Sequence, residues 1–390
     1  MTVIHKIVYF AARPFIALWF LVTGSYTWKR CRPISRNYIV LTNHNTNWDF
    51  LLATVAFRRQ MYFVASEHIF RKGLPSTLLK TFLDPIPRRK GSDGIDTVKN
   101  ILKRLRNGQN VCMMAEGNRS FNGVTGQVLP ATAKLVRKSG AGLITFRIHG
   151  GYFVNPRWSA KTRKGPMWGE TVREYTPEEL AQMSDEDVLR CINADLYVNA
   201  YDDQKDKNYE YTCDAPAENL QTALFICPEC RSLARMNSRG DRFFCEDCGA
   251  EFIFTSKGYF ETADTDRKKK PRFRTITEWS FWQRDVLREK LETFRDSPDR
   301  EIFHTEKACL FSVKQLEGET KLEEGRLAMF CDRIELGSRK FMLTDISAFA
   351  ITLINTVLFT CGKQYYQITM PENMSALQYL EAFEILKKGI

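Results

Sequence analysis

The chain has 390 residues, of which 44% are hydrophobic, and its formal net charge is +11. Because domains usually hold roughly 100–200 residues, this length predicts several domains, and the composition excludes a disordered chain without a core. The basic balance favours an anionic partner, which could be nucleic acid, a membrane surface or a phosphorylated substrate, although a solvated basic surface would give the same balance.

The N-terminal stretch from Ile7 to Trp28 is apolar and aromatic, with Arg13 and Pro14 interrupting it. A spanning helix needs about 20 mostly apolar residues without a central charge, and Pro14 would bend such a helix. We therefore predict that residues 1–36 form a membrane-associated helix that is monotopic or peripheral. A buried helix that covers the core is the alternative. The flanking cations suited to anionic headgroups are Lys6, Lys29, Arg30 and Arg32.

The cysteines indicate the compartment. There are eleven of them, an odd number, and seven are scattered without a pattern. A secretory signal peptide with a small-residue cleavage site is not evident in the sequence. These features favour free thiols in a reducing cytosol over a disulfide framework, so we expect the protein at the cytoplasmic face of the membrane.

Short apolar runs alternate with amphipathic segments from Asn37 to about Gly151. This alternation predicts an α/β domain over residues 37–205, with a mixed, largely parallel sheet flanked by helices. Helix starts are also expected at Thr176 and Ser184, and a polar boundary at 202–210. The predicted strands are 38–42, 61–65, 111–115 and 143–148, and the predicted helices are 50–57, 96–107 and 131–139.

His44 and Asp49 follow the first of these strands and precede a helix, where α/β sheets present catalytic loops. A histidine whose ring is held by a carboxylate can act as a general base. General-base catalysis usually raises the rate of a reaction about 10²–10⁴-fold. A His and an Asp five residues apart also occur often by chance. The pair therefore needs support from elsewhere in the chain.

Two further stretches give that support. Residues 116–120 read Glu-Gly-Asn-Arg-Ser and follow a predicted strand, so a carboxylate and a guanidinium lie at the rim of a tight turn. Residues 84–91 read Asp-Pro-Ile-Pro-Arg-Arg-Lys-Gly and add three cations. A guanidinium can fork onto phosphate oxygens, although surface solvation would explain each arginine taken alone.

Together these stretches resemble the glycerolipid acyltransferase family, whose best-known members are 1-acylglycerol-3-phosphate acyltransferases. The family's Asn-His-x4-Asp motif resembles Asn43, His44 and Asp49, and its Glu-Gly-Thr-Arg-Ser motif resembles residues 116–120. Its block ending in an Ile-x-Arg turn resembles residues 86–88.

The resemblance covers roughly residues 1–205 and includes a helix-then-strand block at 131–148. The chain departs from the family at Asn118, where the family has Thr. It departs again at 145–147, where Thr-Phe-Arg stands in a region that has Pro between two apolar residues in the family. Both departures put the identity of the acyl acceptor in more doubt than the reaction.

The resemblance implies a membrane-associated acyltransferase in which His44 takes the proton from an acceptor hydroxyl and Asp49 holds the imidazole. The donor would be acyl-CoA or acyl carrier protein, and the acceptor a lysophospholipid, foremost 1-acylglycerol 3-phosphate, which gives phosphatidate. Two arginines would clamp the acceptor's phosphate, and Glu116 would hold one of them or an acceptor hydroxyl. The implied substrate-binding residues are Asn43, Arg88, Glu116, Gly117, Arg119 and Ser120.

Four cysteines form two Cys-x2-Cys pairs separated by fourteen residues: Cys227, Cys230, Cys245 and Cys248. Each pair can place two thiolates on one tetrahedral Zn²⁺. The pattern resembles a zinc ribbon and predicts a structural zinc module at 223–262, since four cysteines close the coordination sphere. A docking or spacer role is expected for this module.

Beyond the ribbon, residues 263–299 predict a charged linker and a helix. Residues 300–390 predict a β-rich, barrel-like domain that is capped by a C-terminal helix and resembles a pleckstrin-homology fold.

The alternative function for the chain is a zinc-ribbon binding protein with a nucleic-acid or protein partner and a non-catalytic acyltransferase-like domain. The intact His44, Asp49 and 116–120 motif argue against it, and we do not expect nucleic acid as the partner.

Overall fold

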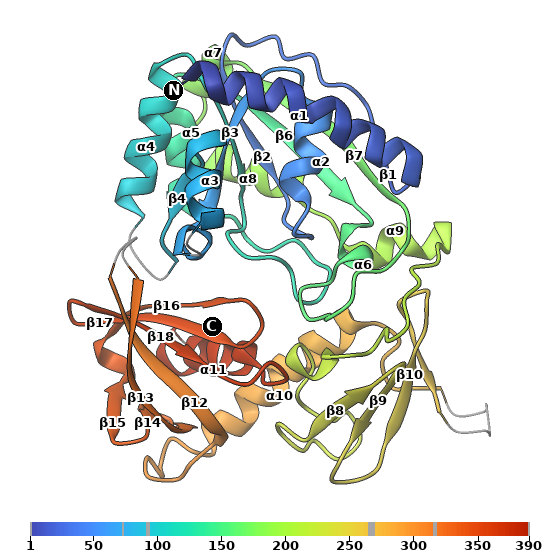
Figure 1. The fold of residues 1–390 in the computed structure, drawn as a ribbon. Helices are drawn as coiled ribbons and strands as arrows, with labels where there is room; N and C mark the ends of the chain where they lie inside the picture. The colour runs from blue at the N-terminus through green and yellow to red at the C-terminus, as the bar shows by residue number, and fades with distance from the viewer. Residues whose placement is uncertain (1, 72–73, 91–93, 264–269, 315–317, 389–390) are drawn as a thin grey trace. The chain divides into compact units, whose positions relative to one another are not determined.

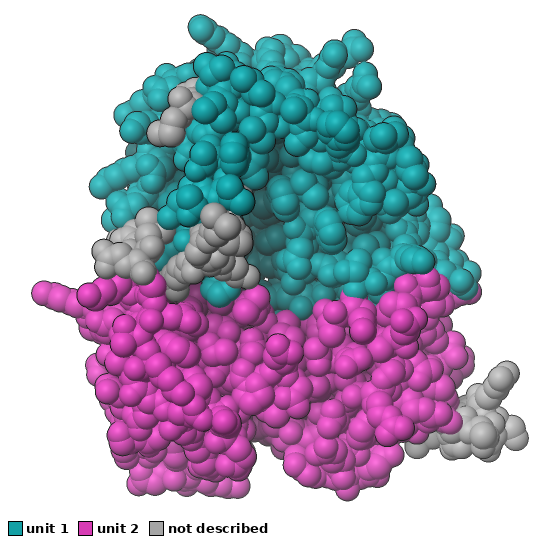
Figure 2. Space-filling model, viewed as in Figure 1, with its two compact units in different colours: residues 1–89, 94–157, 162–211 teal, residues 90–93, 158–161, 212–390 magenta. Residues whose placement is uncertain are grey.

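The computed structural model describes residues 2–71, 74–90, 94–263, 270–314 and 318–388 (Figure 1). The chain divides into two compact units, which Figure 2 colours separately. Unit 1 contains residues 1–89, 94–157 and 162–211, and unit 2 contains residues 90–93, 158–161 and 212–390.

Unit 1 is built on a sheet with the strand order β1-β7-β6-β2-β5-β3-β4. Neighbouring strands are parallel except for β6 and β7, so the predicted mixed, largely parallel sheet is confirmed. Each residue of β2 is buried, as expected for a strand covered on both faces. The strands are β1 (Tyr26–Trp28), β2 (Tyr38–Thr42), β3 (Met61–Ser66), β4 (Ile86–Arg88), β5 (Asn110–Met114), β6 (Gly142–His149) and β7 (Met167–Tyr175).

Helices pack on this sheet through one apolar core, to which Ile101, Val136 and Ile192 each contribute a buried side chain from a different helix. The predicted helix start at Thr176 is confirmed by a capping box with Glu179. The helices of unit 1 are α1 (Thr2–Thr23), α2 (Asp49–Ala56), α3 (Leu74–Phe82), α4 (Ile95–Arg106), α5 (Pro130–Lys138), α6 (Gly151–Val154), α7 (Pro177–Gln182), α8 (Asp185–Leu196) and α9 (Ala200–Lys207).

Two local predictions for unit 1 were wrong. The N-terminal helix is shorter than residues 1–36, because Gly24 takes a φ of +60° and Tyr26 then enters the sheet in β1. The predicted turn at 86–88 is the strand β4, parallel to β3. The boundary predicted at 202–210 lies directly before the division between the two units, which falls after residue 211, although most of the stretch is helix α9, capped by the Asn199 side chain.

The first part of unit 2 is an antiparallel sheet with the order β11-β10-β9-β8. Its aromatic core includes Trp279 of α10, which packs on Phe243, Phe252 and Phe260. Because of this packing, α10 covers the ribbon instead of forming a bare linker. Part of that linker, residues 264–269, lies outside the described residues. The elements are β8 (Met236–Arg239), β9 (Arg242–Cys245), β10 (Glu251–Phe254), β11 (Phe260–Thr262) and α10 (Ile276–Glu292).

The second part of unit 2 is an antiparallel sheet with the order β15-β14-β13-β12-β18-β17-β16, so the predicted β-rich domain with a C-terminal helix is confirmed. The helix packs through Phe383 on Phe349 and through Tyr379 on Phe303. The elements are β12 (Phe303–Lys314), β13 (Gly318–Met329), β14 (Arg333–Leu336), β15 (Arg339–Met342), β16 (Ile346–Thr352), β17 (Thr356–Cys361), β18 (Gln364–Thr369) and α11 (Ala376–Lys388).

Candidate active site

The His44 and Asp49 side chains meet as the sequence predicts, because the loop after β2 bends back before α2 begins. The Nδ1 atom of His44 lies 2.7 Å from Oδ2 of Asp49. The histidine side chain is 24% exposed and the aspartate side chain is fully buried. A carboxylate on Nδ1 keeps that nitrogen protonated, so Nε2 is the basic atom of the neutral ring. This is the arrangement of a general base.

Asp49 is held rigidly by its own loop. Its carboxylate accepts hydrogen bonds from the backbone N–H of Asn45 at 2.9 Å and of Thr46 at 3.1 Å. The Thr46 hydroxyl donates a further bond of 2.9 Å. These donors compensate for the burial of the charge and fix the direction in which the carboxylate faces His44.

The backbone of His44 is held by the 116–120 loop. Its N–H donates to Oε1 of Glu116 at 2.6 Å, and its carbonyl accepts from the N–H of Ser120 at 3.1 Å. The other oxygen of Glu116 accepts from the N–H of Gly126 at 2.6 Å. Both oxygens of Glu116 therefore bind backbone groups, whereas the sequence had suggested Arg119 or an acceptor hydroxyl as the partner. Ser120 is likewise part of the loop structure, since its hydroxyl accepts from the N–H of Gly123.

Asn43 also lies at the start of the loop that carries His44 and Asp49. Its side chain forms two hydrogen bonds of 2.8 Å with the N–H and the carbonyl of Ile148, in the neighbouring strand β6. The side chain is fully buried. Asn43 therefore ties the end of β2 to β6 and positions the residue that follows it, His44.

Arg88 and Gly117 come together from separate stretches of the chain. Gly117 has a φ of +74°, and a Cβ atom at this position would lie 2.7 Å from Nη1 of Arg88. The guanidinium therefore rests on the glycine, and the left-handed backbone conformation at this position favours glycine. Burial lowers the pKa of Arg88. A desolvated guanidinium at the turn is suited to bind an anion.

Arg119 is oriented by Asn155, a residue that the sequence analysis missed. Nη1 of Arg119 donates to Oδ1 of Asn155 at 2.9 Å and to its carbonyl at 3.2 Å. The same Oδ1 accepts from the N–H of Asn47, in the catalytic loop, at 3.2 Å. Burial lowers the pKa of Arg119, and the charge of Asp49 opposes this effect. One amide thus connects the arginine to the loop that carries His44 and Asp49.

Arg157 is a second residue that the sequence did not suggest. Its side chain is buried, and its guanidinium lies 4.3 Å from the centre of the Phe121 ring and donates to the Arg119 carbonyl at 3.3 Å. Burial, followed by the charge of Arg119, lowers the pKa of Arg157 to about 9. The only sequence signal was an arginine next to Asn155-Pro156, which by itself is not diagnostic.

The buried Glu116 carboxyl gives a testable pH dependence. Burial raises its pKa to about 8, although its two backbone N–H bonds favour the charged form. A carboxyl with a raised folded-state pKa favours folding when protonated, so its contribution to stability is lost as the pH rises from about 4.5 to 8. Denaturant unfolding at pH 5, 7 and 9 should show wild-type stability falling relative to Glu116→Gln, which does not titrate. A constant difference between the two proteins would contradict the assignment.

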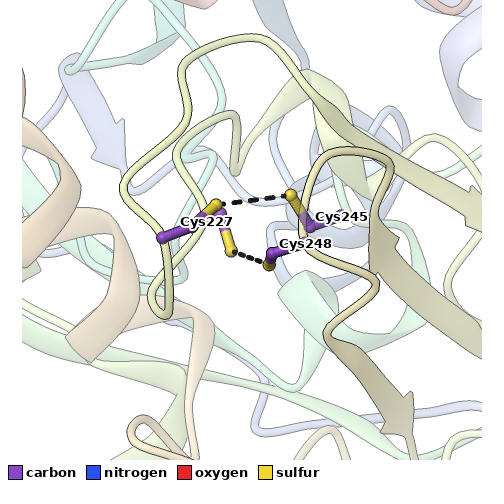
Figure 3. Close-up of side chains that lie close together, drawn as sticks. Cys227, Cys245 and Cys248 are labelled. Atoms are coloured by element: carbon purple, nitrogen blue, oxygen red, sulfur yellow. Dashed lines mark hydrogen bonds between the residues drawn. The ribbon is translucent and has the colours of Figure 1, made fainter.

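The sulfur atoms of the predicted zinc ligands also come together (Figure 3). Sγ of Cys227 lies 3.7 Å from Sγ of Cys248, and the same distance separates Cys230 and Cys245. Four thiolates about 2.3 Å from one Zn²⁺ in a tetrahedron lie about 3.8 Å apart. The donor set and its spacing therefore fit zinc.

Helix α1 has an apolar outer face. Within the described residues, 3–23 form one helix long and apolar enough to cross a membrane, and 11% of that window is buried. Arg13 anchors the helix to α2, donating to the carbonyls of Thr54 at 3.2 Å and Val55 at 2.7 Å. The exposed apolar residues include Ile7, Phe10, Phe15, Leu18, Leu21 and Val22.

Comparison with known proteins gives a family match for part of the chain. Residues 22–149 match the family model described as Acyltransferase. Among solved structures, the chain is similar to the crystal structure of the 1-acyl-sn-glycerophosphate (LPA) acyltransferase PlsC from Thermotoga maritima. The identity is 20%, the match covers 49% of this chain and 78% of that chain, and the TM-score is 0.42. No curated protein matches the chain.

Proposed function

We propose that this protein transfers a fatty acyl group from a thioester donor to the hydroxyl of a lysophospholipid, since residues 22–149 match the Acyltransferase family model. The donor is acyl-CoA or acyl carrier protein, and the foremost acceptor is 1-acylglycerol 3-phosphate. The observation that carries the proposal is the His44–Asp49 pair, with its 2.7 Å contact and its partly exposed imidazole.

In the proposed reaction, Nε2 of His44 takes the proton from the acceptor hydroxyl as its oxygen attacks the thioester carbonyl. The C–S bond then breaks, and the imidazolium returns the proton to the leaving thiolate. Asp49 stabilises the imidazolium while it exists, and its buried, hydrogen-bonded carboxylate keeps the ring oriented. The products are the ester and a free thiol.

Two arginines support a phosphorylated acceptor. Arg88 rests on Gly117, and Arg119 is held by Asn155, so both guanidinium groups lie at the loop that also holds the backbone of His44. Burial weakens the hydration of both cations, which strengthens their attraction to a phosphate. A neutral acceptor would offer these two cations no anionic group to bind.

The outer face of α1 supports membrane association, and the side of the membrane that we propose is the cytoplasmic one. The helix is fixed to α2 by Arg13, in the middle of its length, and presents apolar side chains outward. A helix attached along its side in this way is suited to lie in one leaflet, where the lipid acceptor resides.

Zinc has a structural role in this proposal. The residues that would hold it are Cys227, Cys230, Cys245 and Cys248, which come from the two turns of the ribbon. A bound Zn²⁺ would supply a cross-link between those turns and take no part in acyl transfer, since four thiolates leave no open coordination position.

The test is turnover by the purified, detergent-solubilised protein with acyl-CoA or acyl carrier protein as donor and lysophosphatidate as acceptor. Thiol release and new lipid are followed together, because hydrolysis would release thiol without forming lipid. Formation of phosphatidate supports the proposal. Turnover with a different lysolipid would keep the reaction class and change the acceptor. No turnover with either donor across a panel of lysolipids would refute the proposal and favour the binding-protein alternative.

A further inference from the structure

Arg119 has a fixed backbone and a side chain that a single residue directs. Its carbonyl accepts from Nη1 of Arg157 at 3.3 Å, and the next residue, Ser120, donates its N–H to the His44 carbonyl at 3.1 Å. The long side chain, with its several rotatable bonds, remains to be ordered. Two hydrogen bonds from Nη1, of 2.9 and 3.2 Å, order it, and both go to Asn155.

Asn155 lies beyond residues 22–149, the part of the chain that matches the family model, and it is itself held rigidly. The residue is 8% exposed. Its N–H donates to the Gly151 carbonyl at 3.0 Å, and its Nδ2 donates to the Thr162 hydroxyl at 3.3 Å. Its Oδ1 accepts from the Arg119 guanidinium and from the N–H of Asn47, two groups that only donate, so the amide oxygen must face them. All of these residues belong to unit 1.

The acceptors that order Arg119 carry no charge. In the described part of the chain its guanidinium donates to an amide oxygen and to a backbone carbonyl, and to no carboxylate. The carboxylate whose charge favours the cation is that of Asp49, which already binds His44 and its own loop. An aspartate in place of Asn155 could accept the same bonds, but it would form a buried ion pair that a phosphate must displace. The amide therefore directs the cation without neutralising it.

We propose that Asn155 is a positioning residue that sets specificity for a phosphorylated acceptor, because its neutral amide aims Arg119 at the phosphate and leaves the cation's charge for that group. This inference rests on the proposed function, since it assigns Arg119 to the acceptor's phosphate. Ordering the guanidinium in advance lowers the entropic cost of binding. The same amide oxygen holds the N–H of Asn47, so it also steadies the loop between His44 and Asp49.

Two substitutions separate the charge of this position from its hydrogen bonds. Asn155→Asp keeps the acceptor oxygen and adds a negative charge, so the KM for lysophosphatidate should rise about tenfold, which corresponds to the loss of one charge-assisted hydrogen bond. The value of kcat and the KM for the acyl donor should stay close to wild type. Asn155→Leu has a similar size and accepts no bond. It should raise the acceptor KM and also lower kcat, because the N–H of Asn47 loses its acceptor.

A double-mutant cycle tests whether Asn155 acts through Arg119. Arg119→Gln should raise the acceptor KM by itself, because it removes the cation. In that background Asn155→Asp should change the KM by less than about twofold, since no cation is left to neutralise. If Asn155 had a role only in folding, Asn155→Asp would change the KM equally in both backgrounds.

Asn110 provides the matched control. It is 7% exposed, its Oδ1 accepts from the N–H of Tyr38 at 3.2 Å, and its Nδ2 donates to the Gln60 carbonyl at 2.9 Å. It is the first residue of β5, at the opposite end of this strand from the 116–120 loop. Asn110→Asp should therefore lower the melting temperature, because it buries a charge, and leave both KM values unchanged.

A second readout does not need turnover. Glycerol 3-phosphate should raise the melting temperature of the wild type and of Asn110→Asp, but raise it less in Asn155→Asp and Arg119→Gln. Wild-type turnover with an unchanged acceptor KM in Asn155→Asp would overturn the inference and leave the proposed function intact. Should Asn155→Asp fail to fold, an unchanged acceptor KM in Asn155→Leu would overturn it equally. Equal KM changes in Asn155→Asp and Asn110→Asp would also overturn it, because general destabilisation would then be the cause. Absence of both turnover and stabilisation by glycerol 3-phosphate in the wild type would overturn the proposed function and this inference together.

Discussion

Replacing His44 with Gln is expected to lower kcat about 10²–10⁴-fold, the usual contribution of a positioned general base. The glutamine can still hydrogen-bond to Asp49, so the loop should keep its shape, but it cannot take a proton at neutral pH.

Asp49→Asn should lower kcat by the same order of magnitude. The amide can still accept from Thr46, but it no longer stabilises an imidazolium and can favour the wrong tautomer of His44. Initial rates with saturating acyl donor and acceptor measure both effects.

A second histidine in unit 1 provides the matched control. Nδ1 of His149 also lies 2.7 Å from an aspartate oxygen, that of Asp203, and its ring stacks on Trp168. His149→Gln should keep kcat within a few-fold of wild type, with the melting temperature measured to detect any loss of stability. A His44→Gln protein that is folded and as active as wild type would eliminate this histidine as the base. Equal losses in both variants would mean that neither effect reports on catalysis.

The central pair was predictable because its geometry is local. His44 and Asp49 are five residues apart, between a buried strand and a helix, so a single bend of the loop is enough to bring them together. The partners of Glu116 were not predictable in the same way. One is the backbone N–H of His44, which is 72 residues away in the sequence and adjacent in space only because β2 pairs with β5. A motif specifies a side chain, but it does not specify which backbone group that side chain will meet.

Asn155 illustrates a different reason for failure. It bonds Arg119 and the N–H of Asn47, and its neighbours in the chain form a closed loop. An asparagine before a proline is common in loops, so composition cannot separate it from an ordinary turn residue. Only the fold brings the segment after β6 to the catalytic loop. The distinguishing signal is spatial, and a single sequence does not contain it.

Helices and strands were predictable where a continuous run of their side chains is buried, and were missed where their side chains are only partly buried. Strand β2 has the bounds that its apolar run predicted. Strand β7 was missed because polar residues interrupt its apolar ones and most of its positions are only half-buried, and it gains its position from pairing with β6. Helix α9 was missed because it is a highly charged segment that buries few side chains and depends on the Asn199 cap. In both cases tertiary contacts outweigh local preference.

Removal of zinc is expected to have the largest effect on stability. Structural zinc sites of this kind contribute roughly 10–16 kcal/mol of apparent binding free energy at neutral pH, more than a module of about forty residues gains from its own core. Cys227→Ser, which alters a fully buried ligand, should therefore abolish zinc binding and unfold the ribbon. The expected signs are loss of one bound zinc per chain by elemental analysis, loss of near-UV circular dichroism from the aromatic core around Trp279, and thiols that react quickly.

Cys309→Ser is the matched control, because Cys309 is a partly buried cysteine of β12 whose thiol donates to Glu324 and lies outside the cluster. It should leave the zinc content unchanged. A Cys227→Ser protein that retains the near-UV signal and the wild-type melting temperature would show that packing around α10 suffices without metal.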